Sequence, residues 1–231
     1  MLFIKTDDML HVAQRLEPLG LRFVFIGGGI LGFLINDPAV PTVRGTRDID
    51  IVLEALAVSG YERLEAQLRT AGFQHDMSDG APRCRWLLNG VKVDILSARD
   101  DFSGGNARWL AETVAAPMPV TLKGKELFVA SAPCFLALKL EAFAGRGNND
   151  HIGSRDMDDI VTVIDGRLMI CEEVAAADPA VRRFVAAGFD RLLNDHSFHL
   201  SLPGHLLPDQ GSQRRRAGIL DRMKQIAAMN S

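Results

Sequence analysis

The chain has 231 residues, of which 47% are hydrophobic and 24% charged, as in a globular protein large enough for one domain or two small ones. A net charge of −3 provides no global basic field, and three widely spaced cysteines without a Cys-x-x-Cys pair exclude a disulfide framework or a zinc ribbon. The sequence shows neither a signal peptide nor an apolar run that could span a bilayer, so we expect a cytoplasmic protein with no membrane partner.

The N-terminal third begins with a helix that Thr6 can cap and Gly20 ends, because apolar residues recur between them at helical spacing. Residues 21–26 are almost all apolar and predict a strand buried on both faces. The three glycines Gly27–Gly29 make a turn, and residues 30–35 predict a short helix that stops before an Asp-Pro pair. Glycines at such a strand-to-helix turn suggest a seat for phosphate.

A second strand is predicted at residues 48–53. Charged and apolar residues alternate there, so Asp48 and Asp50 point to one face and Ile49 and Ile51 to the other. Two carboxylates this close repel each other, and a divalent cation such as magnesium relieves the repulsion. The alternative is an ordinary solvated strand face.

An amphipathic helix is expected at residues 59–71, and a β-hairpin follows it. The arms 83–88 and 91–96 flank Asn89-Gly90, a pair favoured in type I′ turns. The second arm alternates and carries a third carboxylate, Asp94, between apolar neighbours. If this arm lies beside the strand of Asp48 and Asp50, the three carboxylates can surround one or two metal ions and promote phosphoryl displacement.

The remaining chain contains two short strands, around 119–122 and 127–129, and then turns helical. Helices are predicted at residues 131–143, 154–164, 168–176, 180–194 and 213–228, with Ser131 and Ser154 as caps of the first two. We therefore expect an α/β (α+β) fold with a mixed sheet flanked by helices. Residues 1–125 form the α/β core, and residues 126–231 form a helical C-terminal region packed on that core.

The glycine turn permits another interpretation. Gly27, Gly29 and Gly32 satisfy G-x-G-x-x-G after a strand, the fingerprint of dinucleotide binding. In that fold the acidic residue ends the second strand, whereas Asp48 begins its strand here and shares the face with Asp50. A dinucleotide-dependent oxidoreductase is therefore the less favoured alternative.

These residues resemble the nucleotidyltransferase superfamily related to DNA polymerase β. That superfamily carries a glycine turn, an acid-x-acid strand and a third acid on a later strand, as do Gly27–Gly29, Asp48-Ile49-Asp50 and Asp94. The run 44–50, RGTRDID, is similar to the Arg-x-Thr-x-Asp-Ile-Asp motif of AbiEii-type nucleotidyltransferases, which include toxins of type IV toxin–antitoxin systems. The helix around Lys139 and the Arg155-Asp156 pair also fit that group, so the resemblance covers about residues 21–165.

The resemblance implies roles for individual residues. Asp48, Asp50 and Asp94 would hold Mg²⁺, with Asp94 also able to deprotonate the acceptor. Lys139 would neutralise phosphate charge, although a lysine on an apolar helix can instead extend to solvent. The implied nucleotide-binding residues are Gly27, Gly28, Gly29, Thr46, Arg47, Lys139, Asp156 and Asp159. Asp156 and Asp159 would position Lys139 or Arg155, or simply stabilise a helix N-terminus.

The expected function is a magnesium-dependent nucleotidyltransferase that moves a nucleoside monophosphate from an NTP to a hydroxyl on tRNA, protein or a small molecule and releases pyrophosphate. A toxin role would add a cognate antitoxin as partner. The main alternative is a non-catalytic nucleotide-binding module of the same fold. The basic stretch 213–216, together with Arg222 and Lys224, is either a solvated helix face or a grip for an RNA backbone.

Overall fold

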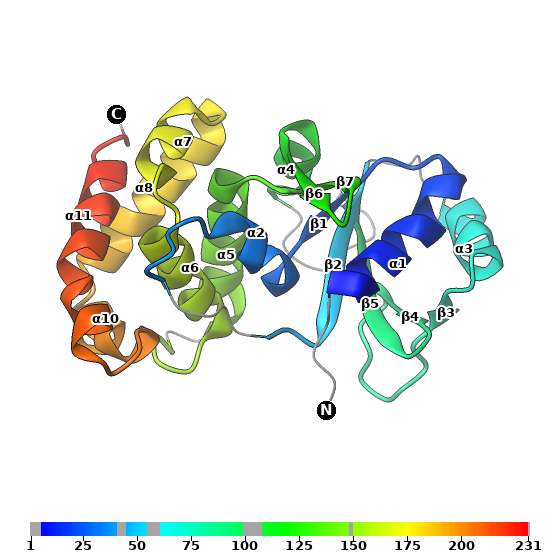
Figure 1. Ribbon diagram of the computed structural model, residues 1–231, viewed down its shortest axis with the longest axis horizontal. Coiled ribbons are helices and arrows are strands. Elements are labelled where there is room, and N and C mark those ends of the chain that lie inside the picture. The colour runs from blue at the N-terminus through cyan, green and yellow to red at the C-terminus, as the bar shows by residue number, and fades with distance from the viewer. Residues whose placement is uncertain (1–5, 41–44, 55–60, 99–107, 148–149, 231) are drawn as a thin grey trace. The chain divides into compact units, whose positions relative to one another are not determined.

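A computed structural model describes residues 6–40, 45–54, 61–98, 108–147 and 150–230 (Figure 1). The chain forms two compact units. The first, called here the α/β unit, comprises Met1–Ile30 and Arg44–Ala130. The second, the helical unit, comprises Leu31–Val43 and Ser131–Ser231. Each unit is described by itself below. That residues 126–231 pack on the core stays a prediction.

The α/β unit is built on a seven-stranded mixed sheet with strand order β3-β4-β5-β2-β1-β7-β6, which confirms the expected fold class. Its strands are β1 (Phe23–Ile26), β2 (Asp48–Leu53), β3 (Gln74–His75), β4 (Arg85–Leu88), β5 (Val91–Ser97), β6 (Pro117–Leu122) and β7 (Lys125–Ala130). Strand β2 pairs in parallel with β5 and antiparallel with β1, so it occupies the middle of the sheet. The two-residue β3 is too short to show any alternation and was not predicted.

Two tight turns set the registers at the sides of the sheet. Asn89 (φ 50°) and Gly90 (φ 80°) both have positive φ, as a type I′ turn requires, and they join β4 to β5 as predicted. Lys123 (φ 49°) and Gly124 (φ 81°) join β6 to β7 in the same way. Because a two-residue turn leaves one register, each hairpin determines which side chains stand opposite one another.

Helices accompany the sheet: α1 (Thr6–Leu16), η1 (Glu17–Leu19), η2 (Gly28–Ile30), α3 (Tyr61–Thr70) and α4 (Leu110–Ala115). Helix α1 has the predicted amphipathic pattern and buries Met9, Val12 and Leu16. Gly20 follows η1 with φ 67°, in agreement with its predicted role as a terminator. The short helix expected at 30–35 is in fact two pieces, η2 and α2 (Leu31–Leu34), and α2 belongs to the helical unit.

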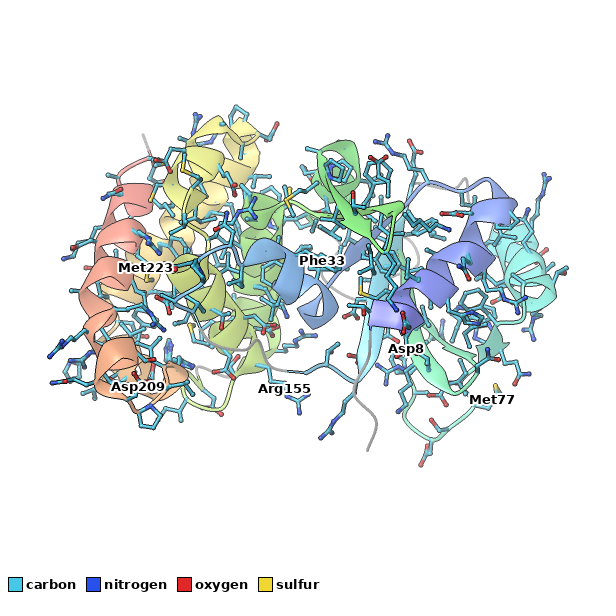
Figure 2. The ribbon with its side chains drawn as sticks, in the orientation of Figure 1. Asp8, Phe33, Met77, Arg155, Asp209 and Met223 are labelled. Atoms are coloured by element: carbon cyan, nitrogen blue, oxygen red, sulfur yellow. The ribbon has the colours of Figure 1, made fainter. Side chains whose placement is uncertain are left out.

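The helical unit contains α5 (Ala132–Arg146), α6 (Arg155–Gly166), α7 (Ile170–Ala176), α8 (Pro179–Leu193), α9 (His196–Ser201), η4 (Leu202–His205), α10 (Gln210–Arg214) and α11 (Arg216–Ala227). Helix α8 packs against α5 and α11, and α6 packs against the same two helices. Side chains such as Phe189 and Met223 are fully buried between them, whereas Met77 of the α/β unit is largely exposed (Figure 2).

The C-terminal end of α6 is tied to a distant segment of the chain. The backbone N–H groups of Asn36 and Asp37 donate to the carbonyl of Gly166 at 2.9 and 3.0 Å, and Arg222 Nη1 donates to Ile164 O at 2.7 Å. A Cβ on Gly166 would lie 2.7 Å from the side chain of Ile35. These contacts satisfy carbonyls that a helix end leaves open, and they attach Leu31–Val43 to the helical unit.

Three details differ from the predictions for this unit. The helix expected at 213–228 is broken into α10 and α11 with Arg215 between them. Helix α9 occupies a region expected to be a loop, and it starts with a cap in which Asp195 accepts from Ser197 N. Ser131 stands at the N-cap of α5 but makes no side-chain cap bond, whereas Ser154 caps α6 as predicted. No helix in the described parts of the chain is long and apolar enough to cross a membrane.

Candidate active site

Three carboxylates lie on one face of the central strands. Asp48 and Asp50 lie on β2, and Asp94 on β5 stands directly opposite Asp50 in the parallel register. All three are half-buried, while the alternating residues Ile49 and Val93 face the core. The predicted juxtaposition of these two strands is confirmed.

The glycine turn adjoins this face. Strand β1 pairs with β2 so that Ile26 stands opposite Asp50, which brings the following residue, Gly27, beside the Asp50 carboxylate. Gly27 has φ +70°, and a Cβ there would lie 2.0 Å from Asp50 Oδ2. A side chain is therefore excluded both by the backbone conformation and by the carboxylate.

The loop before β2 adds a hydroxyl to the same place. Thr46 Oγ1 donates a hydrogen bond to Asp48 Oδ1 at 3.0 Å. The methyl carbon of Thr46 would lie 3.6 Å from a Cβ on Gly29, which is an ordinary contact distance. Thr46 thus connects the glycine turn with the first carboxylate. Arg47 is exposed, and Gly28 is half-buried within η2. Arg44, the first residue of the motif, lies outside the described residues.

Arg85 is the site residue that the sequence reasoning missed. Its Nε donates to Asp94 Oδ1 at 2.7 Å and its Nη2 to Asp94 Oδ2 at 2.7 Å, a bidentate pair. The same Nη2 donates to Asp48 Oδ2 at 3.3 Å. The hydrogen bonds to Asp94 raise the pKa of the Arg85 guanidinium further above its ordinary value, despite the opposing effect of burial.

A signal for Arg85 was available in the sequence. A two-residue turn at Asn89-Gly90 pairs Leu88 with Val91, and counting outward from there pairs Arg85 with Asp94. The predicted hairpin therefore already implies that Arg85 and Asp94 stand opposite each other across the two strands.

The donor set can be compared with the needs of magnesium. Asp48 and Asp50 offer carboxylate oxygens, the hard ligands that Mg²⁺ prefers. Both oxygens of Asp94 already accept hydrogen bonds from Arg85. Within the described ranges, no three carboxylate, imidazole or thiol groups converge closely enough to hold a metal ion. The chemistry of Asp48 and Asp50 thus fits magnesium, while Asp94 in this arrangement is engaged by a cation of the chain itself.

Cys84 lies next to Arg85 and could be mistaken for a nucleophile. Burial raises the pKa of its thiol to about 11, and the negative charge of Asp94 adds to the effect. The thiol is therefore protonated at neutral pH, and the thiolate is the reactive species. The chemistry that we consider at this face is therefore that of the carboxylates and not of the Cys84 thiol.

Lys139, Asp156 and Asp159 form a cluster within the helical unit. Lys139 Nζ lies 3.0 Å from Asp156 Oδ1 and 2.7 Å from Asp159 Oδ2, and all three residues are buried. The alternative in which Lys139 extends to solvent was therefore wrong, because two buried carboxylates hold its ammonium inside. Burial acts to lower the pKa of Lys139, but the charges of Asp159 and Asp156 outweigh it and the pKa is raised.

Arg146 completes this cluster at its edge. Its Nε donates to Asp156 Oδ2 at 3.1 Å, although its side chain is mostly exposed. Burial acts to raise the pKa of Asp156, but the hydrogen bond from Arg146 and the charge of Lys139 lower it below its ordinary value. Arg155, at the start of α6, is exposed (Figure 2). Asp156 and Asp159 thus position Lys139, one of the three arrangements expected.

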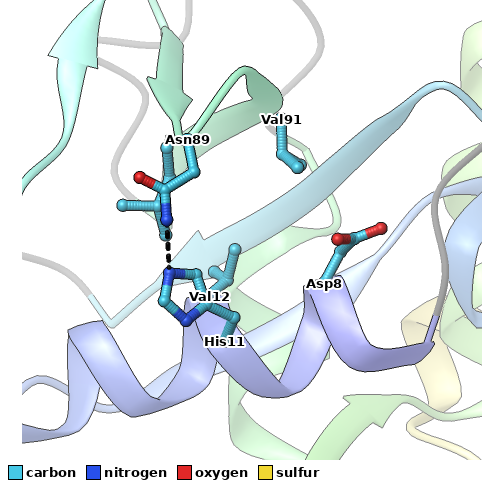
Figure 3. A pocket seen from close by; sticks show the side chains of 6 residues that line it. Asp8, His11, Val12, Asn89 and Val91 are labelled. Atoms are coloured by element: carbon cyan, nitrogen blue, oxygen red, sulfur yellow. Dashed lines mark hydrogen bonds between the residues drawn. The ribbon is translucent and has the colours of Figure 1, made fainter. Parts of the chain in front are cut away.

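A separate pocket of about 170 Å³ lies between α1 and the β4–β5 turn (Figure 3). Asp8, His11 and Asn89 contribute its polar side chains, and Asn89 Nδ2 donates to His11 Nε2 at 3.0 Å. Ligand sites are usually about 300–1,000 Å³. This pocket is smaller and contains none of the predicted site residues, so we assign it no role in the chemistry.

Comparisons with known proteins give a likeness of structure only. No protein-family model and no curated protein matches the sequence. A nucleotidyltransferase-like protein of Paracoccidioides brasiliensis superposes with a TM-score of 0.51 at 18% identity, over 86% of this chain and 92% of that one. The antibiotic-resistance factor ANT(2″)-Ia superposes with a TM-score of 0.50 at 12% identity, over 84% and 96%. At such identities these likenesses establish the nucleotidyltransferase-like fold.

Proposed function

We propose that the protein is a magnesium-dependent nucleotidyltransferase that moves a nucleoside monophosphate from an NTP to a hydroxyl acceptor. The observation that carries this proposal is the position of Asp48, Asp50 and Asp94 on neighbouring strands, directly beside the turn at Gly27. The fold shared with nucleotidyltransferase-like proteins supports it. A solvated strand face would not need a glycine that makes room for one of its carboxylates.

The proposed reaction is an in-line displacement at the α-phosphorus. The acceptor oxygen forms a bond to phosphorus, the bond from phosphorus to the bridging oxygen breaks, and pyrophosphate leaves with its electron pair. Asp94 takes the proton of the acceptor hydroxyl. Asp48 and Asp50 would hold magnesium, with Asp94 as the third predicted ligand, and the ion would neutralise the phosphate charge. The backbone N–H groups of the glycine turn would bind phosphate oxygens.

The remaining predicted residues have supporting roles in this proposal. Thr46 holds Asp48 by the hydrogen bond described above and is proposed to contact the nucleotide together with Arg47. Lys139 is proposed to approach the phosphates as a point cation, oriented by Asp156 and Asp159.

The acceptor is proposed by class: a tRNA end, a protein hydroxyl or a small molecule. Part of the basic C-terminal stretch is not available to grip RNA, since Arg215 and Arg222 bind groups of the helical unit itself. An AbiEii-like toxin role would require a cognate antitoxin, and we retain it as a narrower form of the same proposal.

A labelling experiment tests the proposal. Each α-labelled NTP is incubated with the protein, magnesium and one acceptor class at a time: total RNA, total protein or aminoglycosides. We expect transfer that chelator abolishes, that Asp50→Ala reduces by at least about a hundredfold, and that the exposed control Asp221→Ala preserves. Absence of transfer to all three classes would contradict the proposal.

The two alternatives give different results. A non-catalytic module would show a thermal shift with NTP and magnesium but no transfer of label. An oxidoreductase would bind NAD in the presence of chelator. If Asp48→Asn binds NTP and magnesium as the wild type does, the metal-binding role of Asp48 is wrong.

A further inference from the structure

We propose that Arg85 is an internal competitor of the divalent cation: its guanidinium occupies Asp94 and Asp48 and sets the affinity of the carboxylate site for metal. This inference rests on the proposed function, since it concerns regulation of the same site. It treats Arg85 as a positioning residue that acts through two carboxylates.

The geometry of the guanidinium supports this role. Arg85 grips Asp94 through two parallel hydrogen bonds of 2.7 Å, the arrangement with the strongest directional preference for an arginine–carboxylate pair. The third contact, from Nη2 to Asp48 Oδ2, is longer at 3.3 Å. Arg85 thus binds Asp94 through two short hydrogen bonds and Asp48 through one longer, weaker contact.

The charges lead to the same conclusion. Asp48, Asp50 and Asp94 concentrate negative charge on two adjacent strands, and like charges so placed destabilise one another. The Arg85 side chain is only 18% exposed, so its charge is weakly screened. One guanidinium that touches two of these carboxylates neutralises part of the negative charge that a divalent cation would also neutralise.

Competition follows from shared ligands. Asp48 Oδ2 accepts from Arg85, and an oxygen that coordinates a cation loses much of its value as an acceptor for a positive donor. A cation that binds Asp48 must therefore displace the 3.3 Å contact. A cation that also takes Asp94 as a ligand must displace one of its two bonds from Arg85 as well.

Metal binding without nucleotide tests the proposal directly. Free Mn²⁺ is titrated by its paramagnetic resonance signal against the wild type, Arg85→Gln, Arg85→Lys and the neighbouring control Arg83→Gln, which replaces an exposed arginine. We expect Arg85→Gln to bind Mn²⁺ more tightly by up to about fivefold, because the competing contact involves a partly exposed carboxylate and is worth little more than a surface ion pair. Arg85→Lys should fall between it and the wild type, and Arg83→Gln should match the wild type.

Thermal unfolding gives a second measurement. In chelator, Arg85→Gln should melt below the wild type because Asp94 and Asp48 lose their counter-ion, and added Mn²⁺ should restore most of the difference. If Arg85→Gln does not fold, Mn²⁺ binding is compared between the wild type and Arg85→Lys. This variant keeps the positive charge but cannot form the bidentate pair with Asp94.

Each result decides between the two proposals. Equal or weaker Mn²⁺ binding by the Arg85 variants overturns the competitor role, while nucleotidyl transfer by the wild type would still stand. If no variant binds Mn²⁺, both the competitor role and the metal site are wrong. Tighter binding by the Arg85 variants alone supports the inference.

Discussion

Gly27 and Asp50 are so close that the first residue must lack a side chain: a Cβ on Gly27 would lie 2.0 Å from Asp50 Oδ2. This contact joins two features of the predicted site, the glycine turn and the acid-x-acid strand. It also gives Gly27 a steric role that the G-x-G-x-x-G interpretation does not contain.

Replacement of Gly27 by alanine should therefore damage the site more than a positive φ alone would. Gly20 is a matched control, since it has φ +67° and no atom within 4 Å of an added Cβ. Gly20→Ala should cost about 1–2 kcal/mol of unfolding free energy, the usual penalty for a left-handed residue, and retain nucleotidyl transfer. Gly27→Ala should cost more unfolding free energy than Gly20→Ala and should lower nucleotidyl transfer at least about tenfold. A displaced Asp50 carboxylate needs to raise the activation free energy by only about 1.4 kcal/mol for a loss of that size. Denaturant unfolding measures the stability of the two variants, and label transfer measures their activity. Equal losses in Gly20→Ala and Gly27→Ala would contradict the steric role of Gly27.

Removal of the Lys139 charge should destabilise the helical unit strongly. Lys139→Met leaves Asp156 and Asp159 buried without their shared cation, and breaking a buried pair in this way costs about 3–5 kcal/mol. Lys224→Met is the control, because Lys224 makes a 3.6 Å surface pair with its side chain 65% exposed, and such pairs are worth about 0–1 kcal/mol. Urea unfolding distinguishes the two. A further Asp159→Asn change should recover part of the loss, and failure to do so would mean that packing rather than charge dominates.

Acid should weaken the protein through Asp156. Because its pKa is lowered by folding, Asp156 contributes stability that is fully present above its ordinary pKa of 3.8 and is lost as the pH falls through the folded value. The difference in unfolding free energy between the wild type and Asp156→Asn should therefore be largest near neutral pH and should shrink below pH 3.8. Unfolding curves across this range test the prediction, and a difference that stays constant with pH would refute it.

Replacement of Arg215 by alanine should lower the free energy of unfolding, whereas replacement of the adjacent Arg214 should not. Arg215 Nε lies 3.0 Å from both oxygens of Asp165, and Nη1 donates to Ala39 O at 3.0 Å. Since the Asp165 side chain is only 4% exposed, Arg215→Ala should cost about 2–4 kcal/mol. Arg214→Ala replaces an exposed arginine and should stay within about 0.5 kcal/mol. Thermal and urea unfolding check the pair, and equal losses would show that Arg215 is as dispensable as a solvated residue.

Local sequence patterns predicted much of the sheet. The apolar run of β1, the alternation in β2 and the Asn89-Gly90 turn are short-range signals, because strand periodicity and turn conformation depend on adjacent residues. Helix ends were less predictable. At the break between α10 and α11, the Arg215 side chain reaches Asp165 and Ala39, fifty or more positions away, and no local propensity encodes such a contact.

The sequence by itself determined which side chains can do chemistry here: two carboxylates of alternating period on one strand, a third in a hairpin arm, and a glycine turn before them. Tertiary structure alone decided what each of these groups touches. The parallel pairing of β2 with β5 places Asp94 beside Asp50, and the packing of α5 on α6 directs Lys139 into Asp156 and Asp159. The physical reason is that electrostatic interactions depend on distance in space, and pairings between remote segments are selected by burial of the whole core rather than by the residues that carry the charge.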